Sequence, residues 1–339
     1  MPRITYAKLL KKKTMKLIVD DKIPFIRGLA EQVADEVVYL PGAAITAGDV
    51  RDADAMIVRT RTLCNRQLLE GSRVQFIATA TIGYDHLDTH YLDDAGIRWT
   101  NCPGCNAASV AQYVRNSLMQ AERAGLIRLA EATLGIVGYG HVGRAVGQAL
   151  QPYVKRILVN DPPLSIPQAT LRDIAASCDI ITLHTPLTTE GPYPTWHLMD
   201  EQLLSQSERR PIVINAARGG VADEGALLRA MDEGRIRQAI IDTWENEPEV
   251  NSELLSRAFI ATPHIAGYSA DGKANATRMS LEALARHFRR PMVDAPLTIP
   301  AADPERTGLR YNPIDDSLAL KQAPQTFEQL RGNYPLRRE

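Results

Sequence analysis

The stretch TLGIVGYGHVGRAVGQAL, residues 133–150, decides how the rest of the chain is interpreted. Its apolar start predicts a buried strand, and the amphipathic segment after it predicts a helix. Between the two, Gly138, Gly140 and Gly143 have the spacing G-x-G-x-x-G. In this context the glycines permit a tight turn, close approach of the backbone to a pyrophosphate, and close packing of helix on strand. We therefore predict a dinucleotide site at the N-terminus of this helix.

The next predicted strand, RILVN, indicates which dinucleotide binds. Asp161 directly follows this strand, 23 residues after Gly138. A carboxylate about 20 residues after the first glycine binds ribose hydroxyls, and it would repel a 2′-phosphate. The sequence therefore predicts NAD rather than NADP as the cofactor.

Short apolar runs alternate with amphipathic segments from Lys16 onward, which is typical of parallel sheets covered by helices. A long amphipathic segment begins at Asn106 and has strand-rich sequence on both sides. We interpret it as a linker helix, with a domain boundary near Cys105. The predicted strands are KLIVD, AMIVRT, QFIATA, TLGIVG, RILVN, DIITLHT, PIVINAA, QAIIDTW and RAFIATP.

Both ends of the chain depart from this pattern. Residues 1–14 are basic and precede a second methionine, Met15, so we expect a dispensable extension or an alternative start. From Pro291 onward prolines recur and periodicity fades. Residues 291–339 are therefore predicted to form an extended arm, with one helix near TFEQLRGNY.

Composition excludes several classes of protein. A net charge of −1 gives no overall attraction to polyanions, and no apolar run is long enough to span a membrane. We expect neither nucleic acid nor membranes as partners. Four cysteines in 339 residues favour a reducing compartment, hence the cytoplasm. Cys102 and Cys105 form a C-x-x-C pair without a second pair, so we predict two thiols in a turn and no metal site.

Three polar residues follow predicted strands and suit hydride transfer from a hydroxyl-bearing carbon. His264 would accept the hydroxyl proton near neutral pH. Glu247 would fix the tautomer of the imidazole and stabilise its protonated form. Arg218 would hold a substrate carboxylate bidentately and polarise the adjacent carbonyl.

The order of GYGHVG, NAARGGVADEGALLRAM, DTWENEPE and PHIAGYS resembles the D-2-hydroxyacid dehydrogenase family, from Met15 to about Arg290. The resemblance implies the same catalytic set, Arg218, Glu247 and His264. It also implies a Rossmann cofactor domain, 107–266, inserted in a flavodoxin-like substrate domain. Both are doubly wound parallel-sheet domains. The substrate domain would comprise residues 15–106 and 267–290, and the arm, 291–339, would be a shortened dimerisation region of a homodimer.

Within the family, PGCNAASVAQYV, HIAGYSADGKA and the insertion GPYP resemble a member that acts on a phosphorylated four-carbon 2-hydroxy acid. That resemblance implies substrate contacts at Thr60, Thr81 and Tyr268. On charge grounds, we add Arg59, Arg61 and Lys273 as candidates for the substrate phosphate. Contacts with NAD are implied at Gly138, Gly140, His141, Val142, Gly143, Asp161, Thr185, Asp242 and Gly267.

Three other functions fit parts of the sequence. A phosphoglycerate or glyoxylate/hydroxypyruvate dehydrogenase would share the fold and the catalytic set. The scaffold also resembles NAD-sensing corepressors, in which the cofactor drives assembly. A thiol redox protein would use Cys102 and Cys105. Turnover on a panel of 2-hydroxy acids would identify a sister dehydrogenase. A corepressor would change oligomeric state with NADH without fast turnover, and a thiol redox protein would lose activity on alkylation and use no hydroxy acid.

Overall fold

The computed structural model describes residues 14–166, 168–291, 297 and 299–339. The extension expected at residues 1–14 therefore lies outside the described residues, except for Thr14. The chain divides into two compact units. The first unit comprises Met1–Cys105 and Lys273–Ile299, and the second comprises Asn106–Gly272 and Pro300–Glu339.

The first unit contains a five-stranded parallel sheet with the order β2-β1-β3-β4-β5. This order is flavodoxin-like, as the resemblance implied. Two strands were not predicted, β2 and β5, because both are edge strands that lack a continuous buried run. The strands are β1 (Lys16–Asp20), β2 (Glu36–Leu40), β3 (Ala55–Val58), β4 (Phe76–Thr79) and β5 (Arg98–Thr100).

Helices cover both faces of this sheet, so its central strands are buried except at Lys16, the first residue of β1. Leu17 and Val19 of β1 pack in one core with α1 (Ala30–Val33) and with Leu281 of α11 (Ala270–Phe288). Ile18 points to the opposite core. That core is formed with α2 (Ala47–Val50), α3 (Arg66–Leu69) and α4 (Thr89–Asp94). Because α11 comes from much later in the chain, the first unit is discontinuous.

The second unit contains a six-stranded parallel sheet with the order β11-β10-β9-β8-β6-β7. The chain leaves β6 for β7 on one side and returns to β8 on the other. Such a switch point opens a ligand crevice at the carboxyl ends of the strands. The strands are β6 (Thr133–Val137), β7 (Arg156–Asn160), β8 (Ile180–Leu183), β9 (Ile212–Asn215), β10 (Gln238–Ile241) and β11 (Ile260–Ala261).

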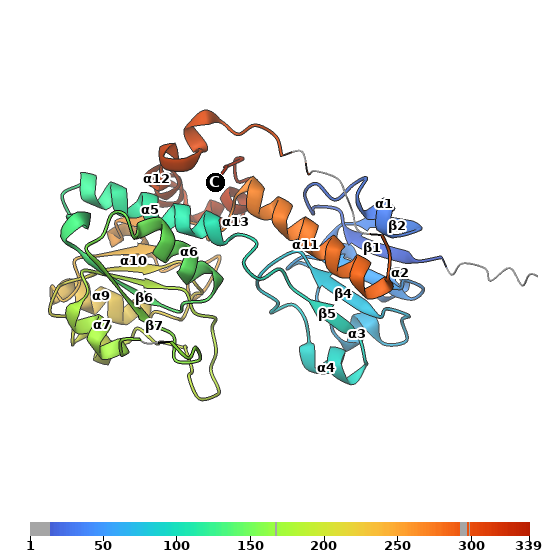
Figure 1. Cartoon of the computed structure of the whole chain (residues 1–339), viewed down its shortest axis with the longest axis horizontal. Coiled ribbons are helices and arrows are strands. Elements are labelled where there is room, and N and C mark those ends of the chain that lie inside the picture. Colours follow the sequence, from blue (N-terminus) through green and yellow to red (C-terminus); the bar gives the residue numbers. More distant parts are fainter. Residues whose placement is uncertain (1–13, 167, 292–296, 298) are drawn as a thin grey trace, which may run out of the picture. The chain divides into compact units, whose positions relative to one another are not determined.

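Alternate residues of these strands enter two cores. Ile180 of β8 packs with α5 (Ala107–Arg123) and α6 (His141–Leu150), which lie side by side in Figure 1. Ile181 packs on the other side of the sheet. The helices there are α7 (Leu171–Ser177), α8 (Glu201–Leu204), α9 (Glu224–Asp232) and α10 (Ser252–Arg257). Among the described residues, no helix is both long and apolar enough to cross a bilayer.

The prediction of an extended C-terminal arm with one helix was wrong in part. The expected helix is α13 (Phe327–Gly332), but α12 (Pro313–Gln322) precedes it and lies along the edge strand β11. The amide of Ala261 donates to Ser317 Oγ of α12 at 2.9 Å. Three of the prolines that suggested an irregular arm, Pro304, Pro313 and Pro324, stand at the first positions of helical turns, where no amide donor is needed. The 3₁₀ turns are η1 (Gly42–Ala44), η2 (Leu129–Glu131), η3 (Pro304–Arg306), η4 (Gly308–Arg310) and η5 (Pro324–Thr326).

Candidate active site

The predicted residues of the second unit gather at one edge of its sheet. Parallel strands present their carboxyl ends on the same side, so residues that follow different strands come together there. Seven of these residues represent the six strands, and each lies within six positions of a strand end. They are Gly138 after β6, Asp161 after β7, Thr185 after β8, Arg218 after β9, Asp242 and Glu247 after β10, and His264 after β11.

The glycines of the loop after β6 are required for different reasons. Gly138 has φ +88°, and a Cβ there would lie 2.6 Å from the carbonyl carbon of His184. A Cβ on Gly143 would lie 2.0 Å from the carbonyl oxygen of Gly138. A Cβ on Gly140 would meet no atom within 4 Å. Close packing therefore explains why positions 138 and 143 require glycine, whereas Gly140 leaves open space in front of α6.

Polar groups around this space fit a dinucleotide. Helix α6 starts at His141 without a side-chain cap, so the amides of its first turn are available for phosphate oxygens. Asp161 Oδ2 accepts a hydrogen bond of 2.6 Å from the amide of Tyr139, which holds the carboxylate beside the loop. Among the described residues, the buried atoms Thr185 Oγ1 and His184 Nδ1 have no hydrogen-bond partner. These residues fit NAD at the ends of β6, β7 and β8.

His264 and Glu247 form a hydrogen-bonded pair. His264 Nδ1 lies 2.8 Å from Oε2 and 3.0 Å from Oε1 of Glu247. An ionised carboxylate only accepts, so Nδ1 carries the proton and Nε2 is left to exchange one with substrate. Burial raises the pKa of Glu247, but the hydrogen bond and charge of His264, the Trp244 amide and Arg331 together lower it below its usual value. The carboxylate is thus ionised at neutral pH.

Asp242 fixes the loop that carries His264. Its side chain is 1% exposed and accepts hydrogen bonds from Thr262 Oγ1 at 2.6 Å and from the amides of Ile265 and Ala266 at 2.8 and 3.0 Å. Its carbonyl accepts the His264 amide at 2.8 Å, and His264 adopts a left-handed φ of +55°. The loop conformation is therefore set by buried hydrogen bonds. Contact of Asp242 with NAD stays a prediction.

Arg218 lies in a turn that packs against the loop of Glu247. The next residue, Gly219, could not carry a Cβ, which would lie 1.7 Å from the carbonyl oxygen of Trp244. Asn215 Nδ2 donates to the carbonyl of Arg218 at 3.0 Å, and Arg218 Nη1 donates to the carbonyl of Ala217 at 2.8 Å. The sequence NAARGG thus places a partly buried guanidinium at the same sheet edge as the His264–Glu247 pair.

Tyr268 contacts Arg331, a residue that the sequence analysis did not single out. Arg331 of α13 donates from Nε to Tyr268 Oη at 3.1 Å, and its Nη1 lies 3.8 Å from Glu247 Oε2. No sequence pattern indicates this contact, because Arg331 lies 63 residues beyond Tyr268 in the arm. Gly267, next to Tyr268, packs against Asn106, since a Cβ there would lie 2.1 Å from Asn106 Nδ2.

The other predicted substrate residues belong to the first unit. Thr60 and Arg61 are exposed after β3, and Lys273 lies in α11. Thr81 follows β4 and donates from Oγ1 to the carbonyl of Gly83 at 2.8 Å. Arg59 forms an ion pair with the fully buried Asp20, with 3.2 Å between Nε and Oδ2. The guanidinium of Arg59 therefore already neutralises Asp20. The substrate roles of all these residues stay predictions.

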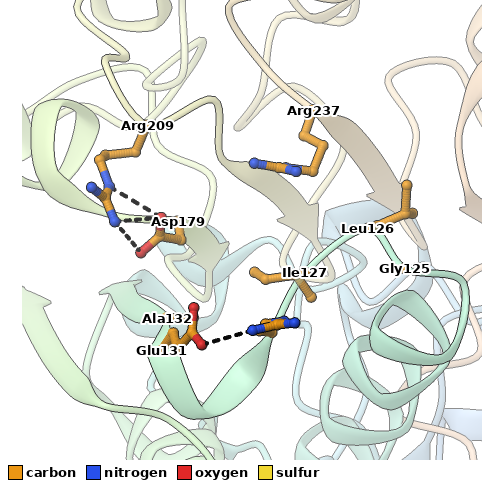
Figure 2. Close-up of a pocket in the computed structure, with 9 residues that line it drawn as sticks. Gly125, Leu126, Ile127, Glu131, Ala132, Asp179, Arg209 and Arg237 are labelled. Carbon is orange, nitrogen blue, oxygen red and sulfur yellow. Dashed lines mark hydrogen bonds and ion pairs between the residues drawn. The ribbon is translucent and has the colours of Figure 1, made fainter.

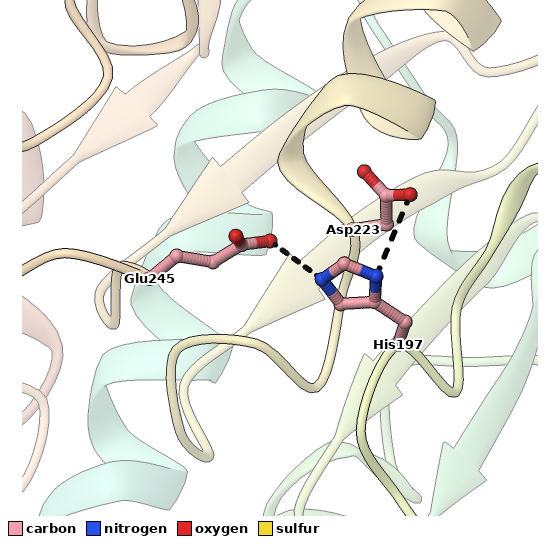
Figure 3. A group of neighbouring side chains, drawn as sticks. All are labelled: His197, Asp223 and Glu245. Carbon is pink, nitrogen blue, oxygen red and sulfur yellow. Dashed lines mark hydrogen bonds and ion pairs between the residues drawn. The ribbon is translucent and has the colours of Figure 1, made fainter.

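A second histidine cluster lies near the site, formed by His197, Asp223 and Glu245 (Figure 3). His197 Nε2 lies 3.1 Å from Glu245 Oε1, and its Nδ1 lies 3.6 Å from Asp223 Oδ2. The two carboxylates face opposite nitrogens of the ring. A metal ion would need both carboxylates beside one nitrogen, so the geometry suits an imidazole that is hydrogen-bonded to Glu245 through Nε2 and faces Asp223 with Nδ1. His197 thus ties the loop that contains GPYP to the loop of Glu247.

A cavity of about 250 Å³ lies at the opposite edge of the same sheet (Figure 2). Its lining includes Ala132, Asp179 and Arg237, which immediately precede β6, β8 and β10. Arg209 is paired there with Asp179 at 3.1 Å. The cavity is therefore separate from the residues that the motifs single out.

The cysteines are buried and form no disulfide. Cys102 Sγ donates to the carbonyls of Thr79 and Ala276 at 3.4 and 3.3 Å. Burial raises the pKa of Cys102, and it raises the pKa of Cys64 and Cys178 to about 12. Thiolate chemistry is disfavoured at these three positions, which argues against the redox alternative.

Two comparisons show the fold and the cofactor domain. Residues 106–266 match the model of the D-isomer specific 2-hydroxyacid dehydrogenase NAD-binding domain. The solved structure of NAD⁺-bound 3-phosphoglycerate dehydrogenase from Entamoeba histolytica is 25% identical. Its TM-score is 0.69, and the match covers 86% of this chain and 99% of that one.

Comparison with known sequences finds relatives within the family that share one enzyme name. Erythronate-4-phosphate dehydrogenase of Bacteroides thetaiotaomicron is 52% identical, over 96% of this chain and 97% of that protein. The enzyme of the same name from Escherichia coli O157:H7 is 40% identical, over 96% of this chain and 87% of that protein. The chain therefore belongs to the D-2-hydroxyacid dehydrogenase family, among the erythronate-4-phosphate dehydrogenases.

Proposed function

We propose that this protein oxidises the C2 hydroxyl of 4-phospho-D-erythronate with NAD, giving 3-hydroxy-2-oxo-4-phosphooxybutanoate, NADH and a proton. This reaction belongs to pyridoxal phosphate (vitamin B6) biosynthesis. The observation that carries the proposal is the 52% identity over almost the full length of an erythronate-4-phosphate dehydrogenase. The geometry of Arg218, Glu247 and His264 supports the same chemistry.

The residues of the chain act as follows in this proposal. Arg218 binds the C1 carboxylate through its planar guanidinium. Nε2 of His264 accepts the proton of the C2 hydroxyl, and Glu247, hydrogen-bonded to Nδ1, stabilises the resulting imidazolium. The chemistry that NAD supplies when bound is acceptance of the hydride from C2. The residues that would hold it are the predicted cofactor residues at the ends of β6, β7 and β8, together with Asp242 and Gly267.

The phosphate of the substrate requires cationic groups in addition to Arg218. Arg61 and Lys273 are our candidates on charge grounds. Arg59 is a weaker candidate, because Asp20 already holds its guanidinium. Thr60, Thr81 and Tyr268 would contact the remaining substrate oxygens. Charge-removing variants Arg61→Gln and Lys273→Gln should raise KM for 4-phosphoerythronate more than KM for unphosphorylated erythronate.

We further propose that the enzyme is a cytoplasmic homodimer. Buried thiols that form no disulfide suit a reducing compartment, and the family resemblance implies dimerisation through the C-terminal arm. Light scattering coupled to gel filtration tests the dimer, for which the expected mass is twice 37.4 kDa. A single species of 37.4 kDa would refute it.

The experiment that tests the reaction is cofactor reduction by purified protein with 4-phosphoerythronate, 3-phosphoglycerate, glycerate and lactate. Each assay is run with and without a 2-oxo acid acceptor, and product is followed beside absorbance, so that tightly held NADH does not hide turnover. Preference for 4-phosphoerythronate is expected. Activity on another acid alone would indicate a sister enzyme, and NAD binding without turnover on any of them would favour an NAD sensor.

A further inference from the structure

Arg331 joins the C-terminal arm to the catalytic pair. Its guanidinium is mostly buried, with 24% of the side chain exposed. Nε donates to Tyr268 Oη at 3.1 Å, while Nη1 lies 3.8 Å from Glu247 Oε2 and 3.7 Å from Glu328 Oε1. One rigid, planar cation thus contacts both the partner of His264 and a predicted substrate residue.

We propose that Arg331 is a positioning residue, which orients Glu247 and Tyr268 and sets the pH at which the His264–Glu247 pair takes up a proton. The proposal deepens the proposed function and rests on it. It assigns a role in the reaction to an arm that the sequence suggested only for dimerisation.

The position of Arg331 is fixed by packing around the arm. Phe327, at the start of α13, is 1% exposed and lies in the core of the second unit. Arg337 is fully buried and donates from Nη2 to the carbonyl of Ala266 at 2.6 Å. The arm is therefore anchored on both sides of Arg331, and one anchor is the loop of His264 itself. A residue held in this way keeps its orientation at little entropic cost.

The charges around Glu247 determine the direction of the effect. His264 faces it from the loop after β11 and Arg331 faces it from α13, while Glu328 lies 3.7 Å from Arg331 Nη1. Asp242 lies behind the His264 loop, and Tyr268 contacts Arg331. A cation at 3.8 Å opposes protonation of the pair. Without Arg331, the pair should therefore hold its proton up to a higher pH, and His264 should become a competent base only there.

The test compares Arg331→Gln with Arg331→Lys and with a control in the same arm, Arg306→Gln. Arg306 pairs with Asp316 at 3.2 Å, so its loss perturbs the arm without removing a charge beside Glu247. The first readout is the pH profile of kcat/KM for 4-phosphoerythronate oxidation. The second is the NMR titration of His264 in protein with ¹³C-labelled histidine and no added cofactor or substrate, assigned by comparison with His264→Gln.

For Arg331→Gln, we expect the acidic limb of the kcat/KM profile and the His264 titration midpoint to move to higher pH. The expected shift is about 0.5–1 pH unit, the size expected for the loss of one nearby charge. Arg331→Lys should restore the midpoint because it keeps the charge. The KM of Arg331→Lys for 4-phosphoerythronate should be several-fold higher than that of the wild type, because the hydrogen bond from Nε to Tyr268 is lost. Arg306→Gln should lower thermal stability and leave both pH readouts unchanged.

An unmoved midpoint and limb in Arg331→Gln would overturn the proposal, as would the same shift in Arg306→Gln. If Arg331→Gln does not fold, Arg331→Lys decides, because an unchanged KM would contradict the positioning of Tyr268. The NMR titration needs no substrate. Failure of the wild-type protein to oxidise 4-phosphoerythronate would therefore refute the proposed function. The NMR titration would still test the effect of Arg331 on the His264–Glu247 pair.

Discussion

His264 Nδ1 lies 2.8 Å from Glu247 Oε2, although the two residues are 17 positions apart in the sequence. Their loops follow β11 and β10, which are adjacent parallel strands. Sheet order therefore brings the imidazole and the carboxylate together, and the buried carboxylate of Asp242 then fixes the histidine loop. This pair and the glycine loop lie at the same sheet edge, which is the arrangement that hydride transfer from a hydroxy acid requires.

Replacement of His264 by Ala should lower turnover by about 10²–10⁴-fold, since a general base contributes about that much. NADH binding should persist, because His264 is not among the residues predicted to hold the dinucleotide, most of which follow β6, β7 and β8. Steady-state kinetics and NADH fluorescence titration measure the two effects separately. Turnover close to that of the wild type would remove His264 from the mechanism.

Replacement of Asp161 by Ala should weaken NAD binding and reduce discrimination against NADP. The carboxylate lies beside the glycine loop, held by the Tyr139 amide, where a ribose would bind. The ratio of kcat/KM values for NAD and NADP checks this expectation. Asp232→Ala removes the same charge at the far end of α9 and serves as the control. An unchanged ratio in Asp161→Ala would place cofactor specificity elsewhere.

The sequence predicted those features that lie within one contiguous segment. Gly138, Gly143 and Asp161 were found because strand, turn and helix follow each other directly, and His264 because it follows a short apolar run. Edge strands such as β2 escaped detection, since their side chains are only partly buried. Arg331 escaped because its contacts with Glu247 and Tyr268 are long-range and no periodic pattern marks them. The recurring prolines predict an extended arm, whereas one of them, Pro313, begins α12.

Two glycines of the loop allow folding and cofactor binding to be separated. A Cβ at position 140 would meet no atom within 4 Å, so Gly140→Ala should fold with nearly unchanged stability. Its methyl group would occupy the space for the pyrophosphate, so the variant should bind NADH at least about tenfold more weakly. Gly143→Ala would place its Cβ 2.0 Å from the carbonyl oxygen of Gly138, so helix and strand must separate. Thermal unfolding and NADH titration distinguish the two. Equal losses of stability in both variants would contradict this assignment.

His184 should make the protein sensitive to mild acid. Burial lowers the pKa of His184 from its ordinary value of 6.5 to about 3, and among the described residues its buried Nδ1 has no partner. Between these two values the unfolded chain binds the proton and the folded chain does not, so stability falls as pH decreases from 6.5 towards 3.

Between pH 7 and pH 5 this one group should cost at most about 2 kcal/mol of unfolding free energy. In His184→Gln that loss should disappear, while the amide can still contact Thr182, which lies 2.9 Å from the histidine ring. Urea unfolding at both pH values measures the difference, with the exposed His90→Gln as a control. If His184→Gln loses as much stability between pH 7 and pH 5 as the wild type, another group is responsible for the acid sensitivity.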